Sequence, residues 1–176
     1  MPRTTPARRS PRRPALPTWH DLDQLMGNAQ VVRHVMNLWP PFLAASIRIE
    51  EVSPDFRDVR VRLKRRPWST NYVGTLYGAS MYSMTDPFWM MMLQRTLGPE
   101  FAVWDTRGEI DHLRPGREDV TARFHLDEAT LDEVRAATAG NAKHLRWFEV
   151  DLVQDDGTVV ARVRKQVYVR RKPARS

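Results

Sequence analysis

The chain has 176 residues, of which 41% are hydrophobic, so it fits one domain with a core of its own. It contains no cysteine, which excludes a disulfide framework, a thiolate metal site and a cysteine nucleophile and is compatible with the cytoplasm. The formal net charge of +7 is concentrated at the ends, because residues 1–17 hold five arginines and residues 170–175 hold four further basic residues. Without these nine, the chain has 19 basic and 21 acidic residues.

The two ends differ in composition from the rest of the chain. Residues 1–17 contain five prolines and no acid, which predicts a disordered basic tail, and residues 171–176 form a second basic tail. No aromatic residue is interleaved with the first arginines to stack bases, so this pattern argues against a nucleic-acid partner. The first tail also lacks the apolar run of a secretory signal, and no segment reaches the roughly 20 apolar residues of a membrane span. We expect one domain over residues 18–170.

The first part of this domain predicts a helix followed by strands. Apolar residues recur at three- and four-residue steps over residues 21–38, with Asp21 as a plausible cap and Pro40-Pro41 as the end of the segment. Residues 47–52 predict a strand. Residues 59–64 alternate between apolar and basic side chains, which is typical of a half-buried strand with one solvent face.

The middle and end of the domain predict a long helix and more strands. Residues 71–98 form a methionine-rich apolar stretch that we interpret as a buried helix, followed by an extended segment in which Gly108 marks a bulge or kink. Residues 120–126 alternate as a strand, a short helix ends at Gly140, and two strands flank the hairpin signal at 155–157. The pattern predicts an α+β fold: a curved antiparallel sheet around one long central helix, with an extra N-terminal helix.

Asp86 is the ionisable residue in the middle of the apolar stretch, and three explanations remain open for it. It caps a helix that starts at Pro87. It is a structural acid paired with an arginine such as Arg95 or Arg114. Or it is catalytic, with a pKa raised by desolvation among methionine and tryptophan side chains.

A longer pattern favours the catalytic explanation. Asn71 is followed six residues later by Tyr77-Gly78-Ala79 and, nine residues after Tyr77, by Asp86; the segment Ile-Asp-His-Leu-Arg-Pro-Gly follows at 110–116. Over residues 45–170 this pattern resembles the hotdog-fold acyl-CoA thioesterases, closest to the phenylacetyl-CoA branch, and the uncharacterised bacterial hotdog families. That branch has His-Gly-Gly where this chain has Tyr77-Gly78-Ala79, and Phe where it has His112.

The resemblance implies a hotdog fold and a mechanism. Asp86 would act as general base or nucleophile, the backbone N–H groups of Gly78 and Ala79 would stabilise the oxyanion, and Asn71 would orient water or the carbonyl. The pocket would lie between the subunits of a homodimer or dimer of dimers. No metal or separate cofactor is implied, because coenzyme A belongs to the substrate.

The remaining candidates concern substrate binding. Two explanations are open for Arg114 and Arg117: they are ordinary surface arginines, or they bind the phosphates of coenzyme A. The acyl pocket is expected to be lined by Tyr77, Met81, Tyr82, Trp89 and Met90. Because tyrosine replaces the histidine at 77, a non-catalytic acyl-CoA or fatty-acyl binder is the alternative function.

Overall fold

The computed structural model describes residues 27–173, so the predicted tail over residues 1–17 and the cap at Asp21 lie outside the described residues. Helix α2 (Ala29–Leu38) begins after Asn28, whose side chain accepts a hydrogen bond from the Gln30 N–H. Helix α3 (Pro40–Ala45) follows it directly. No helix in residues 27–173 is long and apolar enough to cross a membrane.

Six strands form one sheet in the order β1-β2-β4-β5-β6-β3, and every neighbouring pair is antiparallel. The strands are β1 (Ile47–Val52), β2 (Asp58–Leu63), β3 (Phe101–His112), β4 (Val120–His125), β5 (Lys143–Gln154) and β6 (Val159–Arg171). The predicted hairpin at residues 155–157 is confirmed: it joins β5 to β6, and Gly157 adopts a φ of 86°. Helix α6 (Glu128–Ala137) connects β4 to β5.

The predicted central helix consists of two helices, α4 (Gly78–Ser83) and α5 (Phe88–Leu97). Residues 84–87 form the turn between them. Pro87 has no N–H to continue a helical ladder, which explains why a second helix starts after it. The break places Asp86 in a turn instead of inside a helix.

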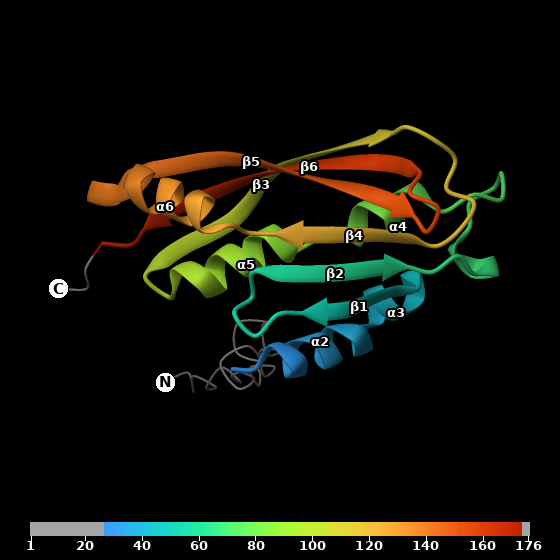
Figure 1. Ribbon diagram of the computed structural model, residues 1–176, viewed down its shortest axis with the longest axis horizontal. Helices are drawn as coiled ribbons and strands as arrows, with labels where there is room; N and C mark the ends of the chain where they lie inside the picture. The colour runs from blue at the N-terminus through green and yellow to red at the C-terminus, as the bar shows by residue number, and fades with distance from the viewer. Residues whose placement is uncertain (1–26, 174–176) are drawn as a thin grey trace, which may run out of the picture.

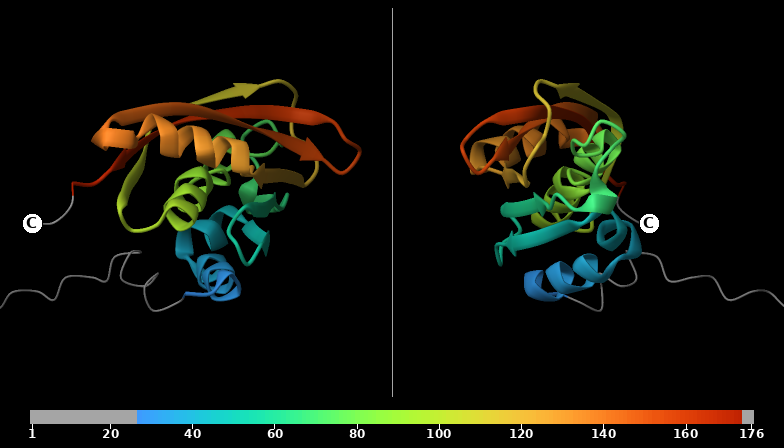
Figure 2. Two further views of the ribbon diagram at one scale, coloured as in Figure 1. Left: turned by 60° about the vertical axis from the view of Figure 1, so that its left-hand side comes forward. Right: turned by 90° about the vertical axis from the view of Figure 1, so that its right-hand side faces the viewer.

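The sheet curves around α5, so the apolar face of every strand reaches the same core (Figures 1 and 2). Strands β4 and β5 pair only over residues 120–122 and 152–154. Beyond this paired stretch, the rings of Phe124 on β4 and Phe148 on β5 pack in the core. The ring of Phe124 contacts Phe88 and Trp89 at centroid distances of 5.1 and 5.4 Å. Trp89 in turn stacks on Phe148 at 4.7 Å. This architecture confirms the predicted curved antiparallel sheet around a central helix.

The two edges of the sheet differ in whether a helix pairs with their backbone groups. Along β1, side chains of α2 take the place of a neighbouring strand: Asn37 donates to the Ile49 carbonyl at 2.9 Å and accepts from the Ile49 N–H at 2.7 Å. Gln30 and Arg33 donate to further carbonyls of the same strand. Strand β3 is the opposite edge, and within the described part of the chain no helix side chain caps its exposed stretch from Thr106 to Glu109. An open edge of this length is a surface on which another strand can pair.

Candidate functional site

A pocket of about 500 Å³ lies between the loop before α4, the beginning of α4 and the end of β3. It contains five of the residues predicted from the sequence to form the site: Asn71, Gly78, Met81, Arg114 and Arg117. Residues separated by up to 46 positions in the chain are thus brought to one cavity. The other lining residues are Val73, Thr75, Leu76, His112, Leu113, Pro115 and Gly116.

Asn71 shapes the loop that forms one wall of this pocket. Its side-chain N–H group donates to Thr75 Oγ1 at 2.9 Å, and its side-chain oxygen accepts from the N–H groups of Val73 and Thr75, both at 3.1 Å. Both ends of the amide are therefore engaged by the loop. Asn71 thus holds this loop in shape, and its expected role in orienting water or a carbonyl stays a prediction.

The beginning of α4 reaches the pocket through Gly78, whereas Tyr77 and Ala79 on either side of it do not line the pocket. The first helical hydrogen bond to the cap residue Tyr77 runs from the Met81 N–H to the Tyr77 carbonyl, at 3.1 Å. The N–H groups of Gly78 and Ala79 come before it and have no acceptor within the helix. The Tyr77 side chain is largely exposed, and Ala79 is exposed as well.

His112 lies directly against this helix beginning. A Cβ atom added to Gly78 would come within 3.1 Å of His112 Cε1 and 3.3 Å of Nε2, so glycine leaves the room that the imidazole occupies. Residues 77 and 112 are the two positions at which the chain departs from the histidine and phenylalanine of the thioesterase pattern. The structure shows that they flank the same glycine. His112 was not singled out as a site residue from the sequence, although its replacement of phenylalanine was the available signal.

Asp86 lies elsewhere, in the turn between α4 and α5, and does not line the pocket of its own chain. The expectation of a lone, desolvated carboxylate is wrong: the side chain is 51% exposed and forms an ion pair with Lys165. The partner is a lysine on β6 and neither Arg95 nor Arg114. The expected capping role is also not observed, because α5 starts at Phe88 and has no side-chain cap.

Lys165 is the buried member of this group, with only 4% of its side chain exposed. Its Nζ donates hydrogen bonds to Asp86 Oδ1 and, at 2.8 Å, to Asp105 Oδ2 on β3. Burial acts to lower the pKa of Lys165, but the hydrogen bonds and charges of the two carboxylates outweigh it and raise this pKa above its usual value. The lysine is therefore charged at neutral pH, bound between two acids.

Lys165 was not predicted, but the sequence carries a signal for it. Val163, Lys165 and Val167 occupy alternate positions of β6, and both valines are fully buried. A lysine in this inward register must be buried, and a buried ammonium needs a carboxylate. Applied to residue 165, this rule would have pointed to an acidic partner in the core.

Tyr82 and Gly108 complete the surroundings of Lys165. The Tyr82 ring centroid lies 4.9 Å from Lys165 Nζ, close enough for a cation–π contact. The Tyr82 hydroxyl occupies space that a side chain at position 108 would fill, only 1.8 Å from an ideal Cβ. The expectation of a bulge at Gly108 is wrong by two residues, because the register shift of β3 lies between Asp105 and Arg107. Gly108 is instead required by the close approach of the tyrosine.

The other predicted residues lie around the core or at the rim. Trp89 packs inside the core against Phe148, and Met90 is partly buried against the same core, so neither lines the pocket. Arg114 donates to the Val159 carbonyl at 3.1 Å from its place at the pocket. Among the described residues, no group of three or more histidine, cysteine or acidic side chains is arranged to hold a metal ion.

Comparison with solved structures shows the hotdog fold. A protein of unknown function from Pseudomonas aeruginosa, described as a probable thioesterase, aligns with a TM-score of 0.69 and 20% identity over 81% of this chain and 95% of that one. The thioesterase HI1161 from Haemophilus influenzae aligns at 0.58, with 14% identity over 80% and 89%. Thioesterase superfamily member 2 from Mus musculus aligns at 0.56, with 19% identity over 80% and 96%. The predicted hotdog fold is thereby confirmed.

Sequence comparison is less informative about activity. No curated protein matches the chain significantly. A family model described as "Domain of unknown function (DUF4442)" matches residues 27–169.

Proposed function

The chain belongs to the DUF4442 family of domains of unknown function, and we propose that it hydrolyses acyl-CoA or related acyl thioesters. One observation carries the proposal: the N–H groups that begin α4 and the imidazole of His112 meet at Gly78, beside a cavity of about 500 Å³. Cavities of this size hold small organic ligands. The thioesterase descriptions of several proteins with this fold support the same reaction class.

The proposed substrate position follows from the donors. The thioester carbonyl oxygen accepts hydrogen bonds from the N–H groups of Gly78 and Ala79, where negative charge develops during attack. His112 lies beside this oxygen and donates to it or polarises it. Arg114 and Arg117, at the same pocket, face the phosphates of coenzyme A.

Asp86 supplies the base in this proposal. Its carboxylate takes a proton from water while the water oxygen attacks the thioester carbon, and collapse of the tetrahedral intermediate releases the thiolate, which leaves as the thiol after receiving that proton. Attack by the carboxylate itself, through an anhydride that water then hydrolyses, gives the same products. Lys165 holds one Asp86 oxygen in place, and the half-exposed side chain remains reachable by water.

The site requires a second copy of the chain, because Asp86 does not line the pocket formed by its own α4. His112 ends β3, whereas Asp105, which shares Lys165 with Asp86, lies in the first half of the same strand. Antiparallel pairing of two copies around the middle of β3 brings the His112 end of one strand beside the Asp105 end of the other. We therefore propose a homodimer in which each pocket is completed by the Asp86 of the other copy.

The test is thiol release from a panel of acyl- and aryl-CoA substrates. Asp86→Asn is expected to lower kcat/KM for the best substrate at least about 100-fold, which is the typical contribution of a positioned general base. Asp132→Asn, which removes an exposed acid on α6, is the matched control and should leave the rate unchanged. If Asp86→Asn and Asp86→Ala both hydrolyse as fast as the parent, the assigned base is wrong.

The second candidate is an acyl-CoA or fatty-acyl binding protein without turnover. The exposed Tyr77, which stands where the thioesterase pattern has histidine, favours it. Binding of an acyl-CoA in calorimetry, together with no thiol release from any substrate of the panel, would establish binding and rule out the hydrolase.

A further inference from the structure

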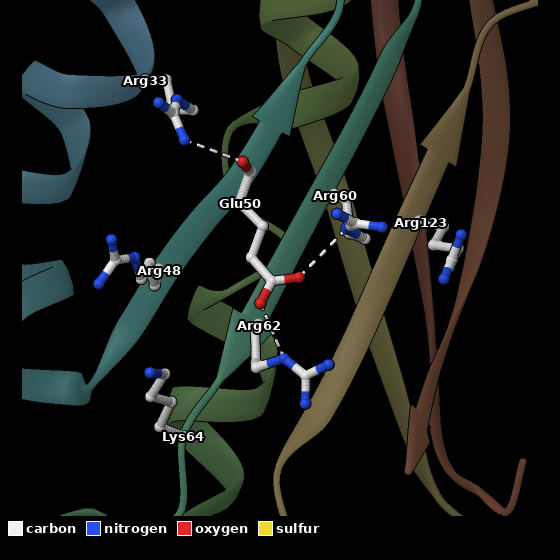
Figure 3. A pocket seen from close by; sticks show the side chains of 7 residues that line it. All are labelled: Arg33, Arg48, Glu50, Arg60, Arg62, Lys64 and Arg123. Atoms are coloured by element: carbon white, nitrogen blue, oxygen red, sulfur yellow. Dashed lines mark hydrogen bonds and ion pairs between the residues drawn. The ribbon is translucent and has the colours of Figure 1, made fainter. Parts of the chain in front are cut away.

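A second cavity, of about 550 Å³, lies on the outer face of the sheet, and it shares no lining residue with the pocket at α4. Figure 3 shows its side chains projecting from α2, β1, β2, β4 and the residue after β2. The lining residues are Arg33, Arg48, Glu50, Arg60, Arg62, Lys64 and Arg123. We propose that this basic cavity binds a small molecule carrying two or more phosphate groups.

The strand register sets like charges directly opposite one another. Arg48 on β1 pairs with Arg62 on β2, and Arg60 on β2 pairs with Arg123 on β4. Directly opposed side chains in antiparallel strands are about 5 Å apart at Cβ, and like charges at this distance destabilise the sheet. An anion bound between these two pairs, which lie in adjoining strand ladders, would reduce the repulsion within each of them.

Acids of the chain neutralise only part of this charge. Glu50 forms ion pairs with Arg60 at 3.1 Å and Arg62 at 2.9 Å, and Arg62 also pairs with Asp155 at 3.0 Å. By contrast, the side chains of Arg48, Lys64 and Arg123 form no ion pair with any residue in the described range 27–173. Three cations on one face thus remain available to a ligand.

Arg33 forms the wall of the cavity on the side of α2. Its guanidinium donates to the Glu50 carbonyl at 3.0 Å, which fixes it beside β1. Its Nε atom is buried and has no hydrogen-bond partner among the residues that the structure describes. A buried N–H group of this kind is costly unless an acceptor reaches it.

The chemistry and spacing of these groups favour phosphate. Guanidinium groups bind phosphate oxygens through paired N–H donors, and arginine predominates among the lining residues. The cations are spread over three adjacent strands, a width of roughly 10 Å at the usual strand spacing, which a single phosphate does not bridge. A diphosphate or triphosphate does. No aromatic side chain lines the cavity to stack a base, which disfavours single-stranded nucleic acid.

The inference is independent of the proposed hydrolysis. The charge balance of the sequence without its tails is slightly acidic, so composition gives no hint of a basic site. The alternation of residues 59–64 already showed a basic strand face, but only the sheet order brings Arg48 and Arg123 beside it.

The experiment is calorimetric titration of the full chain with inorganic tripolyphosphate, at low and at physiological salt. The double variant Arg48→Gln/Arg123→Gln is expected to bind at least tenfold more weakly than the parent. The control variant Arg164→Gln/Arg170→Gln removes the same amount of charge from exposed positions on β6 and should bind like the parent. Both double variants keep residues 1–26, so the basic residues there are the same in each comparison. Absence of tripolyphosphate binding to the parent, or equal weakening in both double variants, would overturn the proposal.

Two further measurements sharpen the result. Because Arg48→Gln/Arg123→Gln removes both like-charge pairs, its Tm without ligand should equal or exceed that of the parent; a lower Tm would contradict the repulsion that the proposal invokes. Binding to vesicles containing a polyphosphorylated inositol lipid, lost in the same variant, would place the phosphates on a lipid headgroup. Tighter binding of a short single-stranded RNA than of tripolyphosphate, through the same two arginines, would refute a small phosphorylated ligand.

Discussion

Lys165 occupies an inward position on β6 at which its neighbours are buried valines. It is accommodated because Asp86 and Asp105 both accept hydrogen bonds from its ammonium and Tyr82 covers it with an aromatic face. This arrangement ties the turn between α4 and α5 to β3 and β6. The position of Asp86, and with it the proposed chemistry, thus depends on a lysine 79 residues away in sequence.

Lys165→Met tests this dependence. Removing the ammonium leaves Asp105, only 23% exposed, without its partner, and we expect the free energy of unfolding at pH 7 to fall by about 1–3 kcal/mol. Thiol release should fall as well, because Asp86 loses its anchor. Chemical denaturation measures the first effect, and Lys143→Met, at an exposed position of β5, is the control.

The pH dependence of stability provides a separate test of the same group. The pKa of Lys165 is raised on folding from its ordinary 10.5, so its stabilisation is complete below pH 10.5 and is lost as pH rises through the higher folded value. The difference in unfolding free energy between the parent and Lys165→Met should therefore shrink above about pH 10.5. A difference that stays constant to pH 12 would contradict the assignment.

Gly108→Ala tests the close approach of Tyr82. An added Cβ would lie 1.8 Å from the Tyr82 hydroxyl oxygen and 2.8 Å from Cζ, so the ring must move away from Lys165. We expect a loss of about 1–3 kcal/mol in denaturation experiments. In a Tyr82→Ala background the same substitution should cost almost nothing, and additive costs in the double variant would show that the two residues do not interact.

From the sequence, candidate site residues could be named only where a local pattern marks them. The spacing of Asn71, Gly78 and Asp86 was recognisable, because the chain keeps the intervals of a known pattern. His112 and Lys165 were not identified, because their importance arises from contacts with Gly78 and Asp86, which lie 34 and 79 residues away. Such contacts depend on the order of the strands in the sheet. The alternation of residues within one strand gives no information about that order.

At the scale of elements, α2 replaces a missing strand along β1. Asn37 both donates to and accepts from Ile49, as a neighbouring strand would. Unpaired strand edges promote association with other chains, so this contact protects the fold on one side while β3 stays open on the other.

Asn37→Ala should lower the free energy of unfolding by about 1–3 kcal/mol, because it leaves two polar groups of β1 without partners. His34→Ala, at an exposed position of the same helix, is the control. The change is measured by chemical denaturation. Equal stability of Asn37→Ala and the parent would show that water satisfies this edge without the helix.

The elements themselves were largely predictable, since each depends on local periodicity. Strand β2 followed from its alternation, and the hairpin from its turn residues. The central helix was recognised from its apolar composition, but its division into α4 and α5 was not settled, because a proline following an acid is compatible with both a kink and a new helix. The hydrogen bonds from side chains of α2 to the backbone of β1 could not be predicted either, because they depend on how the helix and the strand are placed relative to each other.

At the scale of the whole molecule, the uncovered edge of β3 and the distance of Asp86 from its own pocket lead to the same conclusion. Two copies paired along β3 would extend the sheet and complete two sites. We expect light scattering to give the mass of a dimer or a tetramer of the full chain at micromolar concentration. If the chain is a monomer at this concentration and still hydrolyses thioesters with no loss of rate per chain, the shared site is contradicted.

The most direct test is complementation between two inactive variants, Asp86→Asn and His112→Ala. If each site takes Asp86 from one copy and His112 from the other, a mixed dimer contains one intact site and one doubly altered site. Random exchange of subunits makes half of the dimers mixed, so the equimolar mixture should regain about one quarter of the parental thiol-release rate. A mixture that forms mixed dimers, as seen by native mass spectrometry, and stays as inactive as its two components would contradict the shared site.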